Sequence, residues 1–176
     1  TAVWILPMKL VDALLIGDGP LALFCVQELL DRGHRIRAIA SSDAGLQDWA
    51  HSHHIPVVVG PTDWASLLAG PRPDILFNVA ALRILPPELL EFPRLAPINF
   101  HDGPLPRYAG LFAPNWAVMH GERDFGVCWH DMRQPSKDAP SFDSGPILEQ
   151  EAVQVSDDEP VWSLDVRCFE AGALSF

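Results

Sequence analysis

The chain has 176 residues, of which 48% are hydrophobic and 20% charged, and its formal net charge is −11 at pH 7. This length suits one domain with a substantial core, and both fractions are ordinary for a soluble globular chain. Such an acidic balance argues against a broad phosphate-binding surface and makes nucleic acid an unfavourable partner, although it leaves room for a local basic pocket.

The three cysteines, Cys25, Cys128 and Cys168, are widely spaced. They form neither a disulfide framework nor a zinc pattern, so we expect free buried thiols, a cytoplasmic protein and no metal site. No apolar run reaches the length of a membrane span, and no stretch resembles a signal peptide, so no membrane partner is expected. We expect one domain over residues 8–176, with residues 1–7 as an extension or linker and the chain cut within a last helix, as in a domain excised from a longer polypeptide with neighbouring domains.

Apolar runs and helical periodicities alternate along the chain. Strands are expected at Val11–Ile16, Ile36–Ala40, Ile55–Val59 and Asp74–Val79, in a run ending at Asn99 and His101, and at Phe125–His130 and Ile147–Val155, the last of them antiparallel. Helices are expected from Pro20 to Gly33, at Gln47–His53, at Trp64–Leu68 with Thr62 as cap, at Pro87–Glu91 and at Pro114–His120, with a last one that starts at Asp157-Asp158-Glu159. This alternation predicts an α/β fold: a Rossmann-like, mostly parallel sheet flanked by helices, with a late antiparallel strand.

The turn after the first strand matches a dinucleotide-binding pattern. Gly17, Gly19 and Ala22 fit Gly-x-Gly-x-x-Gly/Ala, and Asp43 lies about 20 residues further on. However, Pro20 has no backbone N–H at the helix start, where a pyrophosphate would bind. We therefore expect a tight strand–helix turn, with nucleotide binding as the alternative.

His51, His53 and His54 cluster at the end of a predicted polar helix. No cysteine or well-spaced acidic residue joins them, and metal sites need ligands that converge from fixed positions. We expect a solvated helix end.

The central feature is the pair Asn99 and His101, two positions apart at the end of an apolar run. Alternate side chains of a strand share a face, and open α/β sheets place their chemistry at strand carboxyl ends. An amide and an imidazole there suit a carbonyl substrate, because Asn can donate to a developing oxyanion while His moves a proton or shares the donation. The alternative is a strand end capped by turn-forming polar residues. Asp143 is either a turn residue or a carboxylate that orients a histidine, and spacing does not decide between them.

The ordered motifs resemble the folate-dependent formyltransferase family, whose members move a formyl group from 10-formyltetrahydrofolate to an amine. The resemblance runs from about Val11 to Val155. It rests on Asn99-Phe100-His101, Leu105–Gly110, Ala113-Pro114 with Trp116-Ala117, Gly121-Glu122, Gly126-Val127, Asp143–Leu148 and the loop Arg83–Pro86.

The resemblance implies a role for each matching residue. Asn99 and His101 would hydrogen-bond the formyl oxygen, and Asp143 would raise the basicity of His101 or hold a water that relays the proton of the amine. The pterin of the folate cosubstrate would lie in a slot walled by hydrophobic side chains and closed by an aromatic ring, and a guanidinium would meet the glutamate carboxylate of the folate. The slot residues are Ile84, Leu85 and Leu90 with Phe142, and the guanidinium is that of Arg83.

Asp102 and Gly103 stand where the family usually has Pro followed by Ser or a similar residue. The resulting His-Asp-Gly-Pro-Leu-Pro form resembles formyltransferase domains of nonribosomal peptide synthetases, which implies an aminoacyl group on a carrier protein as acceptor. The alternatives are an amino sugar, another small amine or methionyl-tRNA as acceptor, or water, as in a formyltetrahydrofolate hydrolase. A nicotinamide-nucleotide-binding oxidoreductase domain and a non-catalytic folate-binding module are further alternatives.

Overall fold

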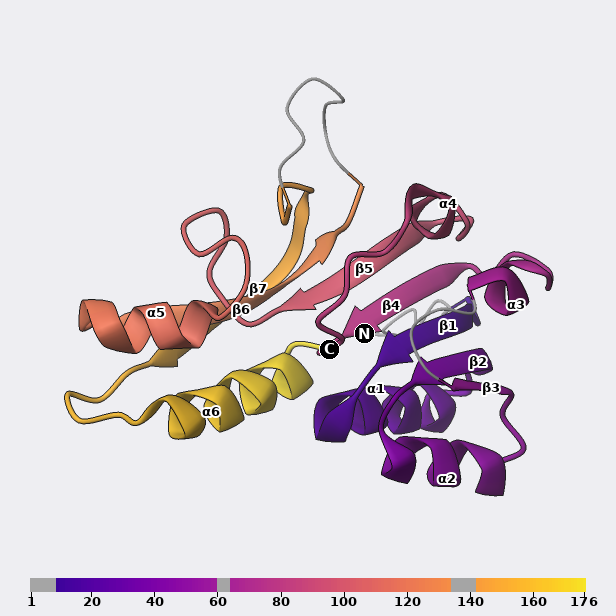
Figure 1. The fold of residues 1–176 in the computed structure, drawn as a ribbon, viewed down its shortest axis with the longest axis horizontal. Helices are drawn as coiled ribbons and strands as arrows, with labels where there is room; N and C mark the ends of the chain where they lie inside the picture. Colours follow the sequence, from indigo (N-terminus) through magenta and orange to yellow (C-terminus); the bar gives the residue numbers. More distant parts are fainter. Residues whose placement is uncertain (1–8, 60–63, 134–141) are drawn as a thin grey trace, which may run out of the picture.

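The computed structural model describes residues 9–59, 64–133 and 142–176. The expected extension at residues 1–7, the cap at Thr62 and residues 134–141 of the polar loop lie outside these ranges. Within them the strands form a seven-stranded sheet in the order β3-β2-β1-β4-β5-β6-β7 (Figure 1).

The sheet confirms the Rossmann-like α/β fold. Its parallel strands are β1 (Asp12–Gly17), β2 (Arg35–Ser41), β3 (Val57–Val59), β4 (Ile75–Val79) and β5 (Ala96–His101). The antiparallel strands are β6 (Asp124–Asp131) and β7 (Ile147–Gln154). The late antiparallel strand is thus confirmed, and β6 is antiparallel as well, a direction that an apolar run in the sequence does not reveal.

The helices are α1 (Gly19–Asp31), α2 (Ala44–Ser52), α3 (Trp64–Leu68), α4 (Pro87–Leu90), α5 (Ala113–His120) and α6 (Val161–Leu174). The predicted start of α2 at Gln47 is wrong, because the Asp43 carboxylate accepts from the N–H of Leu46 at 2.8 Å and caps the helix at Ala44. The acidic run Asp157-Asp158-Glu159 precedes α6 instead of forming its first turn. None of the helices in the described ranges is long and apolar enough to cross a membrane.

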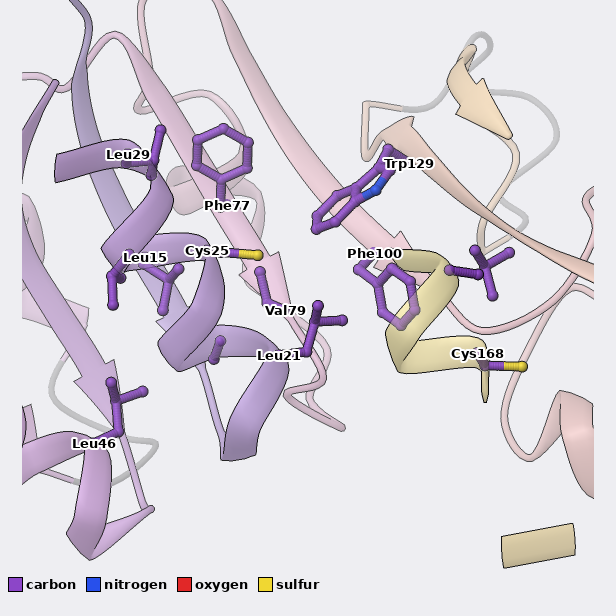
Figure 2. Close-up of a cluster of buried hydrophobic side chains, with 14 of the residues drawn as sticks. Leu15, Leu21, Cys25, Leu29, Leu46, Phe77, Val79, Phe100, Trp129 and Cys168 are labelled. Atoms are coloured by element: carbon purple, nitrogen blue, oxygen red, sulfur yellow. The ribbon is translucent and has the colours of Figure 1, made fainter. Parts of the chain in front are cut away.

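Side chains that alternate along each strand divide the interior between the two faces of the sheet. Leu15, Phe77 and Phe100 belong to a large cluster with α1, α2, α5 and α6, part of which Figure 2 shows. Leu14 and Leu76 face the other way, toward α3 and α4. Because Asn99 and His101 flank Phe100 in β5, they lie on the face opposite the large cluster.

A close contact holds α6 against the strand that carries Asn99 and His101. A Cβ on Gly172 would come within 3.0 Å of Phe100 Cζ, and closer still to Cε2. The Phe100 ring also packs against Trp129, with ring centroids 5.2 Å apart. The absence of a side chain at Gly172 therefore sets the distance between α6 and β5.

Replacement of Gly172 by alanine is expected to destabilise the fold by about 1–2 kcal/mol, because the steric overlap outweighs the gain in helix propensity. At this size the melting temperature falls by roughly 2–4 °C per kcal/mol, which calorimetry can measure. A second substitution, Phe100→Leu, should make Gly172→Ala less costly than it is in the wild-type background. A Gly172→Ala variant as stable as wild type would show that the contact does not limit packing.

Candidate active site

Strand β5 places Asn99 and His101 on one face of the sheet, which confirms the expectation from their spacing. Asn99 is paired in register with Asn78 of β4 on one side and with His130 of β6 on the other. His101 is paired with Cys128 of β6. Polar side chains from neighbouring strands thus converge where β5 ends.

His101 is buried, with 5% of its surface exposed. Its Nε2 lies 2.6 Å from the carbonyl oxygen of Tyr108. Because a carbonyl can only accept, Nε2 carries the proton of the neutral ring, and Nδ1 keeps a lone pair. Nδ1 lies 3.7 Å from Oδ2 of Asp143. The fold therefore presents His101 as a base through Nδ1, with a carboxylate beside it.

Asp143 lies between two imidazoles. Its Oδ2 accepts from the N–H of Gly110 at 2.8 Å, and its Oδ1 lies 3.5 Å from Nε2 of His130. The residue has a φ of 55°, a conformation that Asp and Asn adopt more readily than other non-glycine residues. Of the two roles left open for Asp143, this arrangement favours a carboxylate that faces His101.

The ionised form of Asp143 is stabilised by its surroundings. Burial disfavours it, but the contacts with His130 Nε2 and the Gly110 N–H, and the positive charge that His101 and His130 can carry, outweigh burial and hold the pKa of the carboxyl below its usual 3.8. Asp102, next to His101, shows the opposite shift, because burial and the nearby carboxylates of Asp165 and Asp143 raise its pKa. The two carboxyl groups near His101 therefore differ in how readily they ionise.

The lowered pKa of Asp143 predicts a pH-dependent contribution to stability. A carboxyl with a lower pKa in the folded state stabilises the fold above its unfolded pKa, and this contribution is lost as the pH falls through the folded pKa. Asp143→Asn keeps a residue that tolerates positive φ but removes the charge. We expect the difference in unfolding free energy between wild type and Asp143→Asn to shrink as the pH falls from 7 to below about 4. Denaturant unfolding across this range measures it, and a pH-independent difference would contradict the assignment.

His130 belongs to the site although the sequence did not single it out. It is 1% exposed; its Nε2 lies 3.0 Å from Asn99 Nδ2, and its Nδ1 lies 3.0 Å from the carbonyl oxygen of Asp131. It lies in the segment Phe125–His130, whose apolar residues predict an ordinary buried strand. Only the antiparallel register of β6 against β5 brings its side chain beside Asn99.

Arg83 lies on the segment between β4 and α4. It donates to Ser42 Oγ at 2.9 Å and lies 3.7 Å from Asp18, so its guanidinium links three loops at the carboxyl edge of the parallel strands. The predicted pocket residues after it differ in exposure. Ile84 is 75% exposed and Phe142 63% exposed. Leu85 and Leu90 pack into the smaller cluster, which leaves the backbone of this segment as the group that a ligand could contact there.

The turn at Gly17 and Gly19 contains a carboxylate, that of Asp18, which is held by hydrogen bonds from the next strand and loop. Asp18 accepts hydrogen bonds from Ser41 Oγ, from Ser42 N and Oγ, and from Asp43 N. Burial raises its pKa, but these bonds and Arg83 outweigh burial and hold the pKa below its usual value. A fixed negative charge at the start of α1 opposes a pyrophosphate there. Asp43, the acidic residue of the dinucleotide-binding pattern, caps α2 instead.

The histidine cluster at the end of α2 is exposed, as expected. His53 stacks on Trp49 with ring centroids 4.0 Å apart, and its Nδ1 bonds the Trp49 carbonyl oxygen. Among the residues that the structure describes, no group of three or more His, Cys, Asp or Glu side chains is arranged to hold a metal ion.

The site combines groups suited to acyl transfer. Asn99 Nδ2 can donate to an oxyanion, His101 Nδ1 can accept a proton, and Asp143 can stabilise the resulting imidazolium. A cavity of about 450 Å³ lies elsewhere, at the opposite ends of the parallel strands, where Val11, Ile75 and Phe176 are among its lining residues. No predicted site residue lines that cavity.

Comparisons with known proteins find similar sequences and similar folds. A methionyl-tRNA formyltransferase from Pelotomaculum thermopropionicum is 27% identical over 160 residues, which cover 82% of this chain and 49% of the relative. A formyltetrahydrofolate deformylase from Pseudomonas syringae superposes with a TM-score of 0.78 at 22% identity, over 96% of this chain and 59% of that one. An N-formyltransferase from Helicobacter canadensis, solved with folinic acid and dTDP-3-aminofucose, superposes with a TM-score of 0.74 at 19% identity, over 92% and 60%.

The chain spans about half the length of the methionyl-tRNA formyltransferase that it matches. The two structural likenesses extend over nearly all of this chain and show that its fold is shared. The model of the formyl transferase family matches residues 26–174, a range that contains Asn99, His101 and Asp143. The chain belongs to the formyl transferase family.

Proposed function

We propose that this chain transfers the formyl group of 10-formyltetrahydrofolate to an acceptor amine. The observation that carries the proposal is the convergence of Asn99, His101 and Asp143, in a member of the formyl transferase family. The Helicobacter relative solved with folinic acid, a formyl-folate, supports the cosubstrate.

In the proposed reaction the acceptor nitrogen forms a bond to the formyl carbon. One N–H of Asn99 donates to the formyl oxygen as it becomes an oxyanion, and His101 Nδ1 takes a proton from the attacking amine. The intermediate then collapses: the bond between the formyl carbon and N10 of the folate breaks, and N10 receives the proton. Asp143 stabilises the imidazolium in between, as a carboxylate 3.7 Å away.

For the cosubstrate we propose a slot made by the segment between β4 and α4 together with Phe142. The backbone at Leu85 would read the pterin edge, and the exposed Ile84 and Phe142 would cover its faces. Leu90 would support the slot from the core side. Arg83 would meet the glutamate carboxylate of the folate by exchanging part of its bonding to Ser42 and Asp18.

As acceptor we favour an aminoacyl group carried on a carrier protein. Leu111, Phe112, Trp116 and Met119 are all at least 49% exposed, and they follow Gly110, which bonds Asp143. An apolar surface beside the site suits a protein partner better than a polyphosphate or tRNA. Arginines near it are already paired, Arg107 with Glu122 and Arg133 with Asp131. An amino sugar, supported by the Helicobacter relative, and methionyl-tRNA, supported by the Pelotomaculum relative, are the rivals.

The test supplies 10-formyltetrahydrofolate with one acceptor at a time: an aminoacyl carrier protein, an amino-sugar nucleotide, methionyl-tRNA, or water alone. Mass spectrometry detects a formyl group added to the acceptor, and free formate reports hydrolysis. We expect a formylated aminoacyl carrier protein from wild type and none from His101→Ala. Formylation of the sugar or tRNA alone would overturn the acceptor assignment, and formate release without any transfer would replace the transferase by a hydrolase.

A further inference from the structure

Asn78 is a buried amide one strand away from the proposed reaction. It lies in β4 between Ile16 of β1 and Asn99 of β5, and only 6% of its surface is exposed. Its Nδ2 donates to Asn99 Oδ1 at 2.7 Å. Leu76, two residues earlier on the same face, is a completely buried core residue. The burial of this face of β4 thus favours an apolar side chain at position 78, where the chain has an amide.

The contacts with Asn78 and His130 together determine which way the Asn99 carboxamide faces. Because Oδ1 of Asn99 accepts from Asn78, its Nδ2 must lie on the side of His130, 3.0 Å from Nε2. His130 Nδ1 faces the Asp131 carbonyl oxygen at 3.0 Å and therefore carries the proton of the neutral ring, so Nε2 can accept from Asn99. Only the doubly protonated ring would donate from Nε2 to Asp143 Oδ1, which lies 3.5 Å away. One N–H of Asn99 is used in the bond to His130, and the second remains for an oxyanion.

A reversed Asn99 amide would present an oxygen lone pair to the developing oxyanion, which repels it. Nothing in Asn99 alone prevents this reversal, since the two ends of a carboxamide have nearly the same shape. Asn78 on one side and His130 on the other resolve it. Both neighbours therefore act on catalysis through Asn99, without touching the reacting atoms.

Asn78 carries a cost that its structural role does not explain. Its own Oδ1 is buried and has no hydrogen-bond partner among the residues that the structure describes. A buried, unpaired carbonyl oxygen lowers stability, and an apolar residue of similar volume would avoid that loss. Such a cost persists most readily where the polar group serves the site.

We propose that Asn78 is a positioning residue that holds the Asn99 carboxamide with its nitrogen toward the formyl oxygen. This inference rests on the proposed function only for its kinetic consequence. The orientation of the Asn99 amide is a property of the protein itself and can be measured without an acceptor.

The kinetic test is a double-mutant cycle with Asn78→Leu and Asn99→Ala. Asn78→Leu alone should lower the turnover number of formyl transfer by about tenfold or more while the KM for 10-formyltetrahydrofolate changes little. In the Asn99→Ala background, the same substitution should lower turnover by less than about twofold, because the amide that Asn78 orients is gone. Leu76→Ala, on the same strand and face, is the matched control and should lower the melting temperature without this kinetic pattern.

The second measurement uses the wild-type protein and nuclear magnetic resonance. We expect a through-hydrogen-bond coupling between Asn99 Nδ2 and His130 Nε2, assigned with the Asn99→Ala and His130→Gln variants. The coupling should weaken or vanish in Asn78→Leu. A His130 ring protonated at Nε2, with no coupling to Asn99 in wild type, would overturn the inference even if formyl transfer occurs.

Equal losses from Asn78→Leu in the wild-type and Asn99→Ala backgrounds would also overturn it, since a general structural effect multiplies in both. If the wild-type chain transferred no formyl group to any acceptor, the proposed function would fail. The nitrogen coupling would still decide the orientation of Asn99.

Discussion

Replacement of His101 by alanine is expected to lower the rate of formyl transfer by about 10²–10⁴-fold, the usual contribution of a positioned general base. The hydrogen bond from Nε2 to the Tyr108 carbonyl leaves Nδ1 as the basic atom, and Asp143 Oδ2 lies 3.7 Å from it. Without the imidazole, no described group at this position takes the proton from the attacking amine. The measurement is single-turnover transfer from 10-formyltetrahydrofolate to the acceptor.

The control for His101→Ala is His51→Ala, because His51 is an exposed histidine at the end of α2. It should transfer at the wild-type rate. The binding of a formyl-folate analogue to His101→Ala should stay within a few-fold of wild type, since the imidazole acts in the chemical step. A transfer rate near wild type in His101→Ala would remove this residue from the mechanism.

Replacement of Asn99 by alanine is expected to lower turnover by about 10²–10³-fold, equivalent to about 3–4 kcal/mol of barrier, as for the loss of one oxyanion donor. Its amide nitrogen is held by His130 on one side of β5, and its oxygen by Asn78 on the other, so the donor is in place before substrate binds. Because the oxyanion exists only in the transition state, the KM for the folate should change little.

Gln27→Ala, which removes an exposed amide side chain from α1, is the control for Asn99→Ala and should leave turnover unchanged. Thermal unfolding should show that Asn99→Ala still folds, since the side chain is only partly buried. An increase in KM with unchanged turnover would mean that Asn99 binds the ground state and does not stabilise the transition state.

The parts of this site that lie within one strand could be predicted from the sequence. Asn99 and His101 share a face because strand periodicity is local, and the apolar run before them marked the strand. The mostly parallel sheet could also be predicted, because the alternation of strands and helices is visible in local sequence patterns. The apolar pattern predicts a start of α2 that is too late, because the helix begins at a cap formed by the Asp43 side chain and the Leu46 N–H, which is a polar contact.

The parts that depend on pairing between strands could not be predicted. His130 faces Asn99 only because β6 runs antiparallel to β5 in one register, and a shift by one residue would point its ring to the other face. Asn78 is likewise one polar residue in an otherwise apolar strand, and only the pairing of β4 with β5 brings it beside Asn99. Asp143 was assigned from motif order, and its position rests on a long-range bond to Gly110.

The most direct test of the central claim, that this chain binds a formyl-folate at the Asn99–His101–Asp143 site, is thermal unfolding with a stable 10-formyltetrahydrofolate analogue, with NADH in parallel. A ligand at about 100 times its dissociation constant adds about 2.7 kcal/mol, or roughly 5–10 °C for a chain of this size. We predict a shift with the folate analogue and none with NADH, whose pyrophosphate would meet the Asp18 carboxylate. A shift with NADH and none with the analogue would contradict the account and assign the glycine turn to a nucleotide.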